Sequence, residues 1–426
     1  MVILLLFFMF ICAILVRIPI TYALGLSTLI YITFIIHVPY HIIPQRMVAS
    51  LNSFPILAIP MYILLGKLMN IGGITNRIFA FAKCLVGHFV GGLAHVNVVS
   101  SIIFSGMSGS ALADAAGLGI VEIKAMKDQG FPDAFSAAVT AVSSTIGPVI
   151  PPSIIMVMYG VLASASIGKL FMAGVVPGLI MGIGMMLIIT FISHKRSYPV
   201  SKKATFRELK KSFFEALPSL FTIVIIFAGI IGGIFTPTEA GGVAVLYSLF
   251  LVACYKKGNY KFLKDAFLET AISTGSILIV FSTASIFAWL ITIEQIPETL
   301  SGILLSITPN KYFILIFINI ILIVMGMFMD VLSILIITVP VFAPIVIDVL
   351  GLDPIHFGVI VVLNLMIGGL TPPFAMLLFV VCKTANVKFE EAIKETLPFY
   401  IPILIILMIF TFVPAISLFL PNFLFR

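Results

Sequence analysis

The stretch IGPVIPPS at residues 146–153 returns as IGGLTPPF at residues 367–374, and these two stretches decide the fold. Each lies inside a long apolar run and contains a glycine followed by two consecutive prolines. Proline lacks an N–H and its ring clashes with the preceding helical turn, so a double proline breaks a helix. We therefore predict broken helices over residues 133–163 and 354–382. A kinked structural helix would explain one such break, but two related breaks favour a functional role.

The composition predicts that lipid surrounds the rest of the chain. Of its 426 residues, 61% are hydrophobic and 10% are charged, and the mean hydropathy is +1.25. A soluble domain carries roughly 25% charged residues. The net charge of +7 comes from basic residues in short loops, which indicates cytoplasmic loops rather than nucleic-acid binding. We predict an all-α polytopic membrane protein.

The apolar runs give a consistent path across the membrane. A crossing helix needs about 20 apolar residues, which predicts roughly five spans in each half of the chain. The predicted spans are residues 2–16, 19–37, 54–71, 133–163 and 171–193, then 213–235, 240–255, 266–293, 354–382 and 398–420. Two further apolar stretches, 87–127 and 311–348, must begin and end on the same side, so each is predicted to be a re-entrant helical hairpin.

An odd number of spans per half inverts the second half relative to the first, a pattern typical of secondary transporters. We predict a first repeat over residues 1–193, a basic cytoplasmic connector over 194–212 and a second, inverted repeat over 213–426. The repeat is supported by three residue pairs with nearly the same offset: Gly147 with Gly368, Pro177 with Pro398, and, one residue shorter, Gly106 with Gly326.

The ends of the chain predict its orientation in a bacterial inner membrane. A signal peptide carries its positive charge before the apolar run, whereas Arg17 follows the first one. We predict an uncleaved first span, with both termini on the periplasmic side. Cys12, Cys84, Cys254 and Cys382 are scattered, and the histidines have no ligand-like spacing. The sequence therefore predicts no disulfide framework, metal cluster or cofactor.

The predicted hairpin tips carry the polar chemistry. The first, SGMSGS at residues 105–110, is small and rich in hydroxyls. Hydroxyls and free carbonyls suit sodium or a carboxylate-bearing substrate, although small residues also serve helix packing. The second, GMFMDVLS at residues 326–333, places Asp330 in an apolar run. An acid at membrane depth is a functional hypothesis by default. Asp114 stays open between hairpin structure and ion binding.

Two helix starts are predicted from capping patterns. Thr371 precedes Pro372 and is predicted to cap the second half of its broken helix, with proline at the first helical position. The stretch Thr236-Pro-Thr-Glu239 predicts a capping box, which is favoured over a functional role for Glu239.

At these residues the chain resembles the large membrane subunit of tripartite ATP-independent periplasmic (TRAP) transporters. The matching stretches are SGMSGSALADAAGLG (105–119), IGPVIPPS (146–153), GGIFTPTEAG (232–241), GMFMDVLS (326–333) and GGLTPPFA (368–375). The resemblance implies an elevator-type fold, in which a transport domain with both hairpins and both broken helices moves against a scaffold. It also implies sodium-driven import of an organic acid, with sialic acid and C4-dicarboxylates as candidates.

The same resemblance implies two partners and a set of site residues. The partners are a periplasmic substrate-binding protein and a small membrane subunit of about four spans, expected as a separate chain. One implied sodium site uses Ser105, Gly109, Ser110, Ser144 and Gly147. The other uses Gly326, Met329, Gly368 and Thr371. The implied substrate site uses Ser108, Ser153 and Asp330, although Asp330 would repel an acid unless it meets hydroxyls, an amine or sodium.

Two other classes of function compete with this interpretation. A channel, or a carrier without sodium coupling, is one, although paired hairpins argue against an open pore. An intramembrane serine protease is the other, because GMSG at residues 106–109 has the GxSG form of rhomboid proteases. That chemistry needs a base, and the downstream histidines His194 and His356 are predicted to lie in loops. No Walker-type GxxxxGK[ST] motif is present, so ATP is not expected to drive transport. We expect no enzymatic activity.

Overall fold

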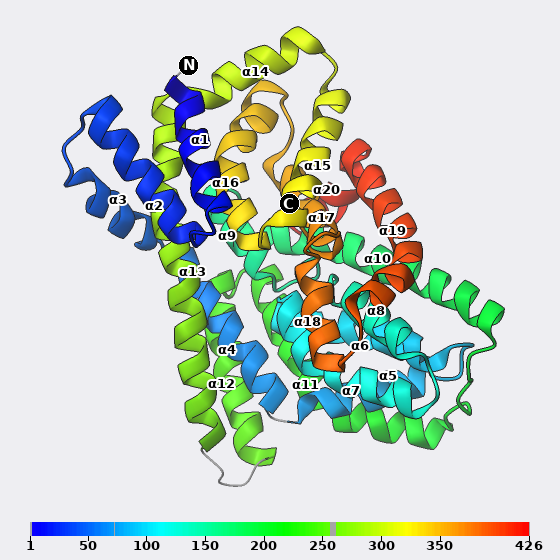
Figure 1. Cartoon of the computed structure of the whole chain (residues 1–426). Coiled ribbons are helices and arrows are strands. Elements are labelled where there is room, and N and C mark those ends of the chain that lie inside the picture. Colours follow the sequence, from blue (N-terminus) through cyan, green and yellow to red (C-terminus); the bar gives the residue numbers. More distant parts are fainter. Residues whose placement is uncertain (1, 72, 256–260, 426) are drawn as a thin grey trace.

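The computed structural model describes residues 2–71, 73–255 and 261–425, and within them every regular element is a helix (Figure 1). The described residues contain 7 helices that are long and apolar enough to cross a membrane, or 8 if one bent pair forms a single span. The all-α polytopic fold predicted from composition is therefore confirmed.

The first four helices include one that the sequence analysis missed. Helices α1 (Val2–Leu15) and α2 (Ile20–Tyr31) are followed by α3 (Ile42–Leu51), which lies between the predicted spans 19–37 and 54–71, and by α4 (Ala58–Ile71). The chain bends by 62° between α3 and the following helical stretch Phe54–Asn70, which contains most of α4. No residue of α3 is buried, so α3 carries no buried apolar stripe from which a helix could be predicted.

Two more helices occupy predicted loops. Helix α5 (Ile74–Val86) replaces a basic loop, and its buried residues Ile74, Ile78 and Ala82 recur every four positions, as on one face of a helix. Helix α14 (Ile296–Ile307) replaces an external loop. Both are too short to cross a membrane, so a search for spans of about 20 apolar residues passes over them.

Each half of the chain contains a helical hairpin. The first consists of α6 (Gly92–Ser108) and α7 (Ala111–Asp128), and the second of α15 (Lys311–Phe328) and α16 (Val331–Pro344). The first turn requires glycine, because Gly109 has a φ of +61° and a Cβ at this position would clash with the carbonyl of Pro152. Ser110 caps α7 and Asp330 caps α16. The two turns therefore bring polar side chains to the tips of otherwise apolar hairpins.

A broken helix follows each hairpin. Helix α8 (Asp133–Ser144) is separated from α9 (Ile154–Leu162), and α17 (Pro354–Leu370) from α18 (Met376–Ala385), by stretches that contain the paired prolines. The peptide bonds Pro151–Pro152 and Pro372–Pro373 are both cis. Each break touches its hairpin through the backbone: Ile154 N–H donates to the Gly109 carbonyl at 3.4 Å, and Phe374 N–H donates to the Met327 carbonyl at 3.3 Å.

One predicted cap is wrong and one is confirmed. Thr371 ends α17 instead of starting α18, and its hydroxyl donates to the Ile367 carbonyl at 2.7 Å. Ala375 occupies the N-cap position of α18, because the non-helical break extends past both prolines. The capping box at Thr236 is present: its backbone N–H donates to Glu239 Oε2 at 2.8 Å, and the Glu239 N–H donates back to the Thr236 hydroxyl at 3.3 Å.

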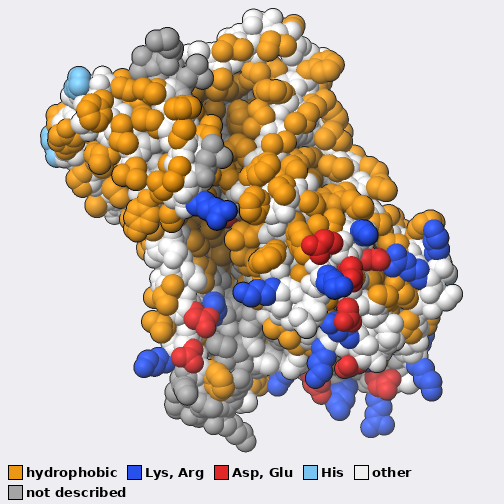
Figure 2. Space-filling model, in the orientation of Figure 1, with side chains coloured by type: hydrophobic (Ala, Val, Ile, Leu, Met, Phe, Trp, Pro, Cys, Tyr) orange, Lys and Arg blue, Asp and Glu red, His pale blue; other side chains and the backbone are white. Residues whose placement is uncertain are grey.

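Five long helices and the short α20 complete the fold. They are α10 (Ile167–Arg196), α11 (Phe206–Ile231), α12 (Pro237–Tyr255), α13 (Lys261–Ile293), α19 (Phe389–Phe412) and α20 (Pro414–Leu424). In the stretch expected as a connector, residues 194–196 end α10 and residues 206–212 begin α11, because a polar helix end can extend beyond the apolar run, and residues 197–205 join the two helices. Figure 2 shows charged side chains gathered over the lower part of the molecule, whereas the upper part is mainly hydrophobic.

Candidate functional site

The first hairpin tip places three serines in different settings. The Ser105 hydroxyl donates to the Ser101 carbonyl at 2.5 Å inside α6. The Ser110 hydroxyl accepts the Ala113 N–H at 3.3 Å and so caps α7. Ser108 lies between them, with 1% of its surface exposed, and its hydroxyl has no hydrogen-bond partner among the described residues. Ser108 is therefore available to a ligand.

The break between α8 and α9 lies directly against this tip. A Cβ on Gly147 would be 3.3 Å from the Ala111 nitrogen and from the Ser110 carbonyl carbon, so the break and the tip are in close contact here. The Ser144 hydroxyl donates to the Thr140 carbonyl at 2.7 Å. The structure thus brings Gly109, Ser110 and Gly147 together, and their backbone and hydroxyl oxygens are the hard ligands that sodium prefers.

Ser153 has a structural task in this arrangement. It is fully buried, its hydroxyl donates to the Pro148 carbonyl at 2.6 Å, and it accepts the Met156 N–H at 3.2 Å. These bonds close the break and cap α9. The one proton of the hydroxyl is therefore already donated, and one of its two acceptor positions is occupied.

The second tip is joined to its break by two glycines. A Cβ on Gly326 would lie 2.5 Å from the Gly368 Cα, so the backbones of α15 and α17 touch there. Met329 follows α15, and its N–H donates to the Met325 carbonyl at 3.0 Å. Thr371 lies at the other side of the contact, at the end of α17. These four predicted site residues come from the two elements that meet at the second tip.

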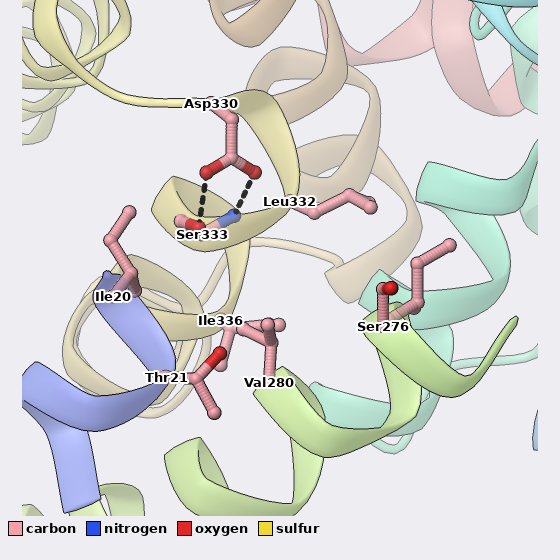
Figure 3. A pocket seen from close by; sticks show the side chains of 9 residues that line it. Ile20, Thr21, Ser276, Val280, Asp330, Leu332, Ser333 and Ile336 are labelled. Carbon is pink, nitrogen blue, oxygen red and sulfur yellow. Dashed lines mark hydrogen bonds between the residues drawn. The ribbon is translucent and has the colours of Figure 1, made fainter. Parts of the chain in front are cut away.

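Asp330 acts as a helix cap in this structure. One carboxylate oxygen accepts the Ser333 N–H at 3.1 Å, and the other accepts the Ser333 hydroxyl (Figure 3). The carboxylate borders a cavity of about 290 Å³ between α2, α13 and α16, together with Thr21 and Ser276. Thr21 and Ser276 line the same cavity, but the hydrogen bonds of the carboxylate in Figure 3 go to Ser333.

A larger cavity, of about 690 Å³, lies beside the first hairpin tip. Ser108, Gly109 and Ser110 line it, whereas Ser153 and Asp330 do not. The two cavities share Ile277 and Leu332 in their walls, so they are neighbours. The three predicted substrate residues therefore lie in different places: Ser108 lines the larger cavity, Ser153 is the buried cap of α9, and Asp330 borders the smaller cavity.

Charged residues that the sequence analysis overlooked also line the larger cavity. They are Lys67 on α4 and Asp265 and Glu269 on α13. The Lys67 ammonium forms an ion pair with the Glu269 carboxylate. The signal was present in the sequence, because Lys67 is a lone cation inside a predicted span.

Another acid that was not predicted, Glu122, lies on α7 together with Asp114. Asp114 and Glu122 are each 1% exposed, and none of their carboxylate oxygens has a hydrogen-bond partner among the described residues. The hydroxyls of Ser101 and Ser144 lie beside Asp114. Both acids lie on the buried face of the hairpin arm, and neither lines the larger cavity.

The histidines do not assemble a protease site. His356 was predicted to lie in a loop, but it is buried in α17, where its Nδ1 lies 2.7 Å from the Ser417 hydroxyl. His194 was also placed in a loop and belongs to the last turn of α10. Asp353 caps α17, which begins at Pro354, the first residue of the predicted broken helix, so His356 lies in the first turn of a helix and not in a loop. Among the described residues, the side-chain hydrogen bond of His356 is therefore made with Ser417 and not with Ser108.

Comparisons with known proteins agree on one family. Residues 7–416 match the profile described as "Tripartite ATP-independent periplasmic transporter, DctM component". The chain is 44% identical over 379 residues to the sialic acid TRAP transporter large permease protein SiaM of Vibrio cholerae, covering 89% of this chain and 88% of that protein. It is 38% identical over 374 residues to the C4-dicarboxylate TRAP transporter large permease protein DctM of Pseudomonas aeruginosa, covering 88% and 87%.

A solved structure shares the fold. The YdaH transporter of Alcanivorax borkumensis, whose topology is described as unusual, superposes with a TM-score of 0.58 at 14% identity and covers 86% of each chain. The relatives are named as transporter permeases, and the apolar helices are those of a multi-pass inner-membrane protein. The chain therefore belongs to the DctM component family of tripartite ATP-independent periplasmic transporters, and it is a transport subunit, not an enzyme.

Proposed function

We propose that this chain imports an organic acid, of the sialic acid or C4-dicarboxylate class, by coupling its movement to sodium. The observation that carries the proposal is the contact of each hairpin tip with a helix break, through Gly109 and Ile154 in one half and Met327 and Phe374 in the other. Such breaks expose backbone groups at membrane depth, where they can bind ions. The names of the relatives supply the two substrate classes.

The residues at each tip fit a sodium ion. At the first tip, Ser105, Gly109, Ser110, Ser144 and Gly147 would supply hydroxyl and carbonyl oxygens. At the second tip, Gly326, Met329, Gly368 and Thr371 would supply mainly carbonyl oxygens. A bound ion would draw each tip and break together, and so would hold the neighbouring substrate surface in shape. Ser108 would contact the substrate directly, whereas Asp330 would act from the adjoining cavity and Ser153 by holding the break.

The order of elements supports an inverted repeat and an elevator movement. Hairpin, broken helix and long helix follow one another in each half, as α6 to α10 and as α15 to α19. We propose that residues 1–193 and 213–426 are the repeats and that residues 194–212 connect them in the cytoplasm. The hairpins and broken helices would move together against a scaffold that includes α4 and α13.

The assembly would contain two further proteins. We propose that a small membrane subunit of about four spans stabilises the scaffold and that a periplasmic binding protein delivers the acid. Both termini would face the periplasm, because charged side chains, which are typical of cytoplasmic loops, gather over the lower part of the molecule (Figure 2), whereas the N-terminus lies at its top (Figure 1).

The test is uptake into proteoliposomes that hold the chain with its small subunit. The binding protein and labelled sialic acid or succinate are added outside, with or without an inward sodium gradient. We expect saturable uptake that needs both sodium and the binding protein. Uptake that does not saturate would indicate a channel, and uptake indifferent to sodium would indicate an uncoupled carrier; either result would contradict the proposal.

A further inference from the structure

Lys67 is an unusual residue for the apolar helix in which it lies. It lies in the apolar stretch LLGKLMN of α4. A cation at membrane depth is costly and usually marks a substrate or ion pathway. Its side chain is 34% exposed and borders the cavity of about 690 Å³, so it meets whatever enters that cavity. Among the described residues that line this cavity, Lys67 is the one cation.

The first hairpin tip packs onto α4 directly beside this lysine. A Cβ on Gly66 would lie 3.3 Å from the Ser108 Cα, so the tip rests on the residue that precedes Lys67. The Ser108 hydroxyl lines the same cavity and has no hydrogen-bond partner among the described residues. A buried hydroxyl without a partner is unfavourable until a ligand bonds to it. An ammonium and a free hydroxyl on one cavity are a donor pair for a carboxylate.

Glu269 is suited to be a temporary partner of Lys67. Its side chain is 57% exposed, so it has room to turn away from the Lys67 ammonium. Asp265 lies one helical turn earlier on α13, in the same wall. A half-exposed ion pair contributes little to stability. An incoming carboxylate that bonds to both Lys67 and Ser108 can therefore replace Glu269 at small cost.

We propose that Lys67 and Ser108 form the carboxylate-binding subsite of the transported acid, and that Glu269 holds the Lys67 ammonium when no acid is bound. This inference rests on the proposed import of an organic acid. It adds a residue from α4 to a site otherwise built from hairpin tips and helix breaks. Lys67 thereby becomes the group that selects for a negative charge on the substrate.

The experiment measures binding to the purified complex of the chain with its small subunit, in sodium and without the binding protein. Labelled sialic acid and labelled succinate are the probes, and methyl esters of the same acids compete against them. Esters keep the shape of the acid but lose the charge. We expect Lys67→Gln to weaken binding of the acid about tenfold, as the loss of a charged hydrogen bond does, and to leave binding of the ester unchanged.

Three variants serve as controls. Lys67→Arg keeps the charge and is expected to retain most of the affinity for the acid. Glu269→Gln frees the ammonium, so the acid is expected to bind as tightly as to the unchanged protein or more tightly. Lys211 is 78% exposed on α11, and Lys211→Gln should leave both affinities unchanged. Size-exclusion profiles and melting temperatures establish that each variant is folded.

The outcomes separate this inference from the function on which it rests. If the unchanged complex binds neither acid and transports neither in the proteoliposome assay, both are overturned. If the unchanged complex binds an acid and Lys67→Gln still prefers it to its ester, only the role of Lys67 is overturned. An equal loss of acid and ester binding in Lys67→Gln would also overturn it, because that loss indicates a structural role.

Discussion

Gly326 and Gly368 meet at the second hairpin tip with no room for a side chain on either. A Cβ on Gly368 would lie 2.6 Å from the Gly326 Cα, which is closer than real carbon atoms approach, whereas a Cβ on the neighbouring Gly369 would lie 3.6 Å from Val331. Two adjacent glycines of the same helix therefore differ in what they tolerate. This difference gives a matched pair of substitutions at the proposed sodium site.

We expect Gly368→Ala to lower stability by about 1–3 kcal/mol, the usual cost of overpacking, and to abolish sodium-dependent uptake because it separates tip from break. Gly369→Ala should be tolerated. Melting of the detergent-solubilised complex and proteoliposome uptake measure the two effects. Equal melting temperatures for the two variants would show that the backbones do not touch.

Glu122 provides a second prediction at this scale, because a buried acid without a partner is costly when charged. Replacing it with the isosteric amide in Glu122→Gln should not lower the free energy of unfolding, and we expect a rise of about 1 kcal/mol or more. Glu215→Gln, at a side chain that is 53% exposed, is the control and should change nothing. A clear fall for Glu122→Gln, measured by thermal melting, would mean that the carboxylate has a bound cation.

At the scale of elements, each hairpin is joined to its broken helix by a buried amide. Asn97 on α6 donates to the Thr140 hydroxyl at 2.7 Å and accepts the Ser143 hydroxyl at 2.6 Å, both on α8. In the second half, Asn319 on α15 accepts an amide N–H of Asn364 on α17 at 2.8 Å. Equivalent elements are thus held by equivalent bonds, which favours their moving as one unit.

A double-mutant cycle tests this join. Asn97→Ala and Ser143→Ala should each destabilise the protein by about 1–3 kcal/mol, because each leaves a buried polar group without a partner. Their effects should also couple by about 1 kcal/mol. Ser100→Ala is the matched control, since that buried hydroxyl has no partner among the described residues to lose. Simple additivity in unfolding measurements would argue against a shared network.

The sequence predicted elements well where glycine, proline or serine forces the backbone. The breaks at Pro151 and Pro372 and the turn at Gly109 follow from local chemistry alone. Short helices such as α5 were missed because their stability comes from packing a narrow face onto neighbours. The prediction that Thr371 caps α18 was wrong for a related reason. The length of the helix break depends on the contact between the break and the hairpin, and no local sequence pattern contains that contact.

For the whole molecule, the distribution of charge predicts which end faces the cytoplasm. In a variant without the native cysteines, a cysteine at Ser201 should react with an impermeant maleimide only after the membrane is opened. A cysteine at Asn310, before α15, should react in intact spheroplasts. The positive-inside rule gives this orientation. Labelling of both positions from one side would contradict the inverted arrangement of the two halves.

The candidate site shows the same limit at this scale. The sequence indicated Ser108 and Asp330 because their motifs are local, but the cavity wall that faces Ser108 comes from α4 and α13, which lie far away along the chain. A lone Lys67 in an apolar run gives no indication of its partner. Only the packing of α4 against α13 and the first hairpin brings Lys67, Glu269 and Ser108 to one cavity.

Each hairpin tip is attached to its helix break by a hydrogen bond between main-chain atoms, Ile154 N–H to Gly109 in one half and Phe374 N–H to Met327 in the other. Most substitutions leave main-chain groups in place, so side chains around these contacts can change over generations while the attachment persists. On the proposed sodium coupling, a lineage would acquire a new cargo by altering cavity walls such as α4, while the main-chain groups that would hold the ion stay the same. Such a division would account for the different acids named for its relatives.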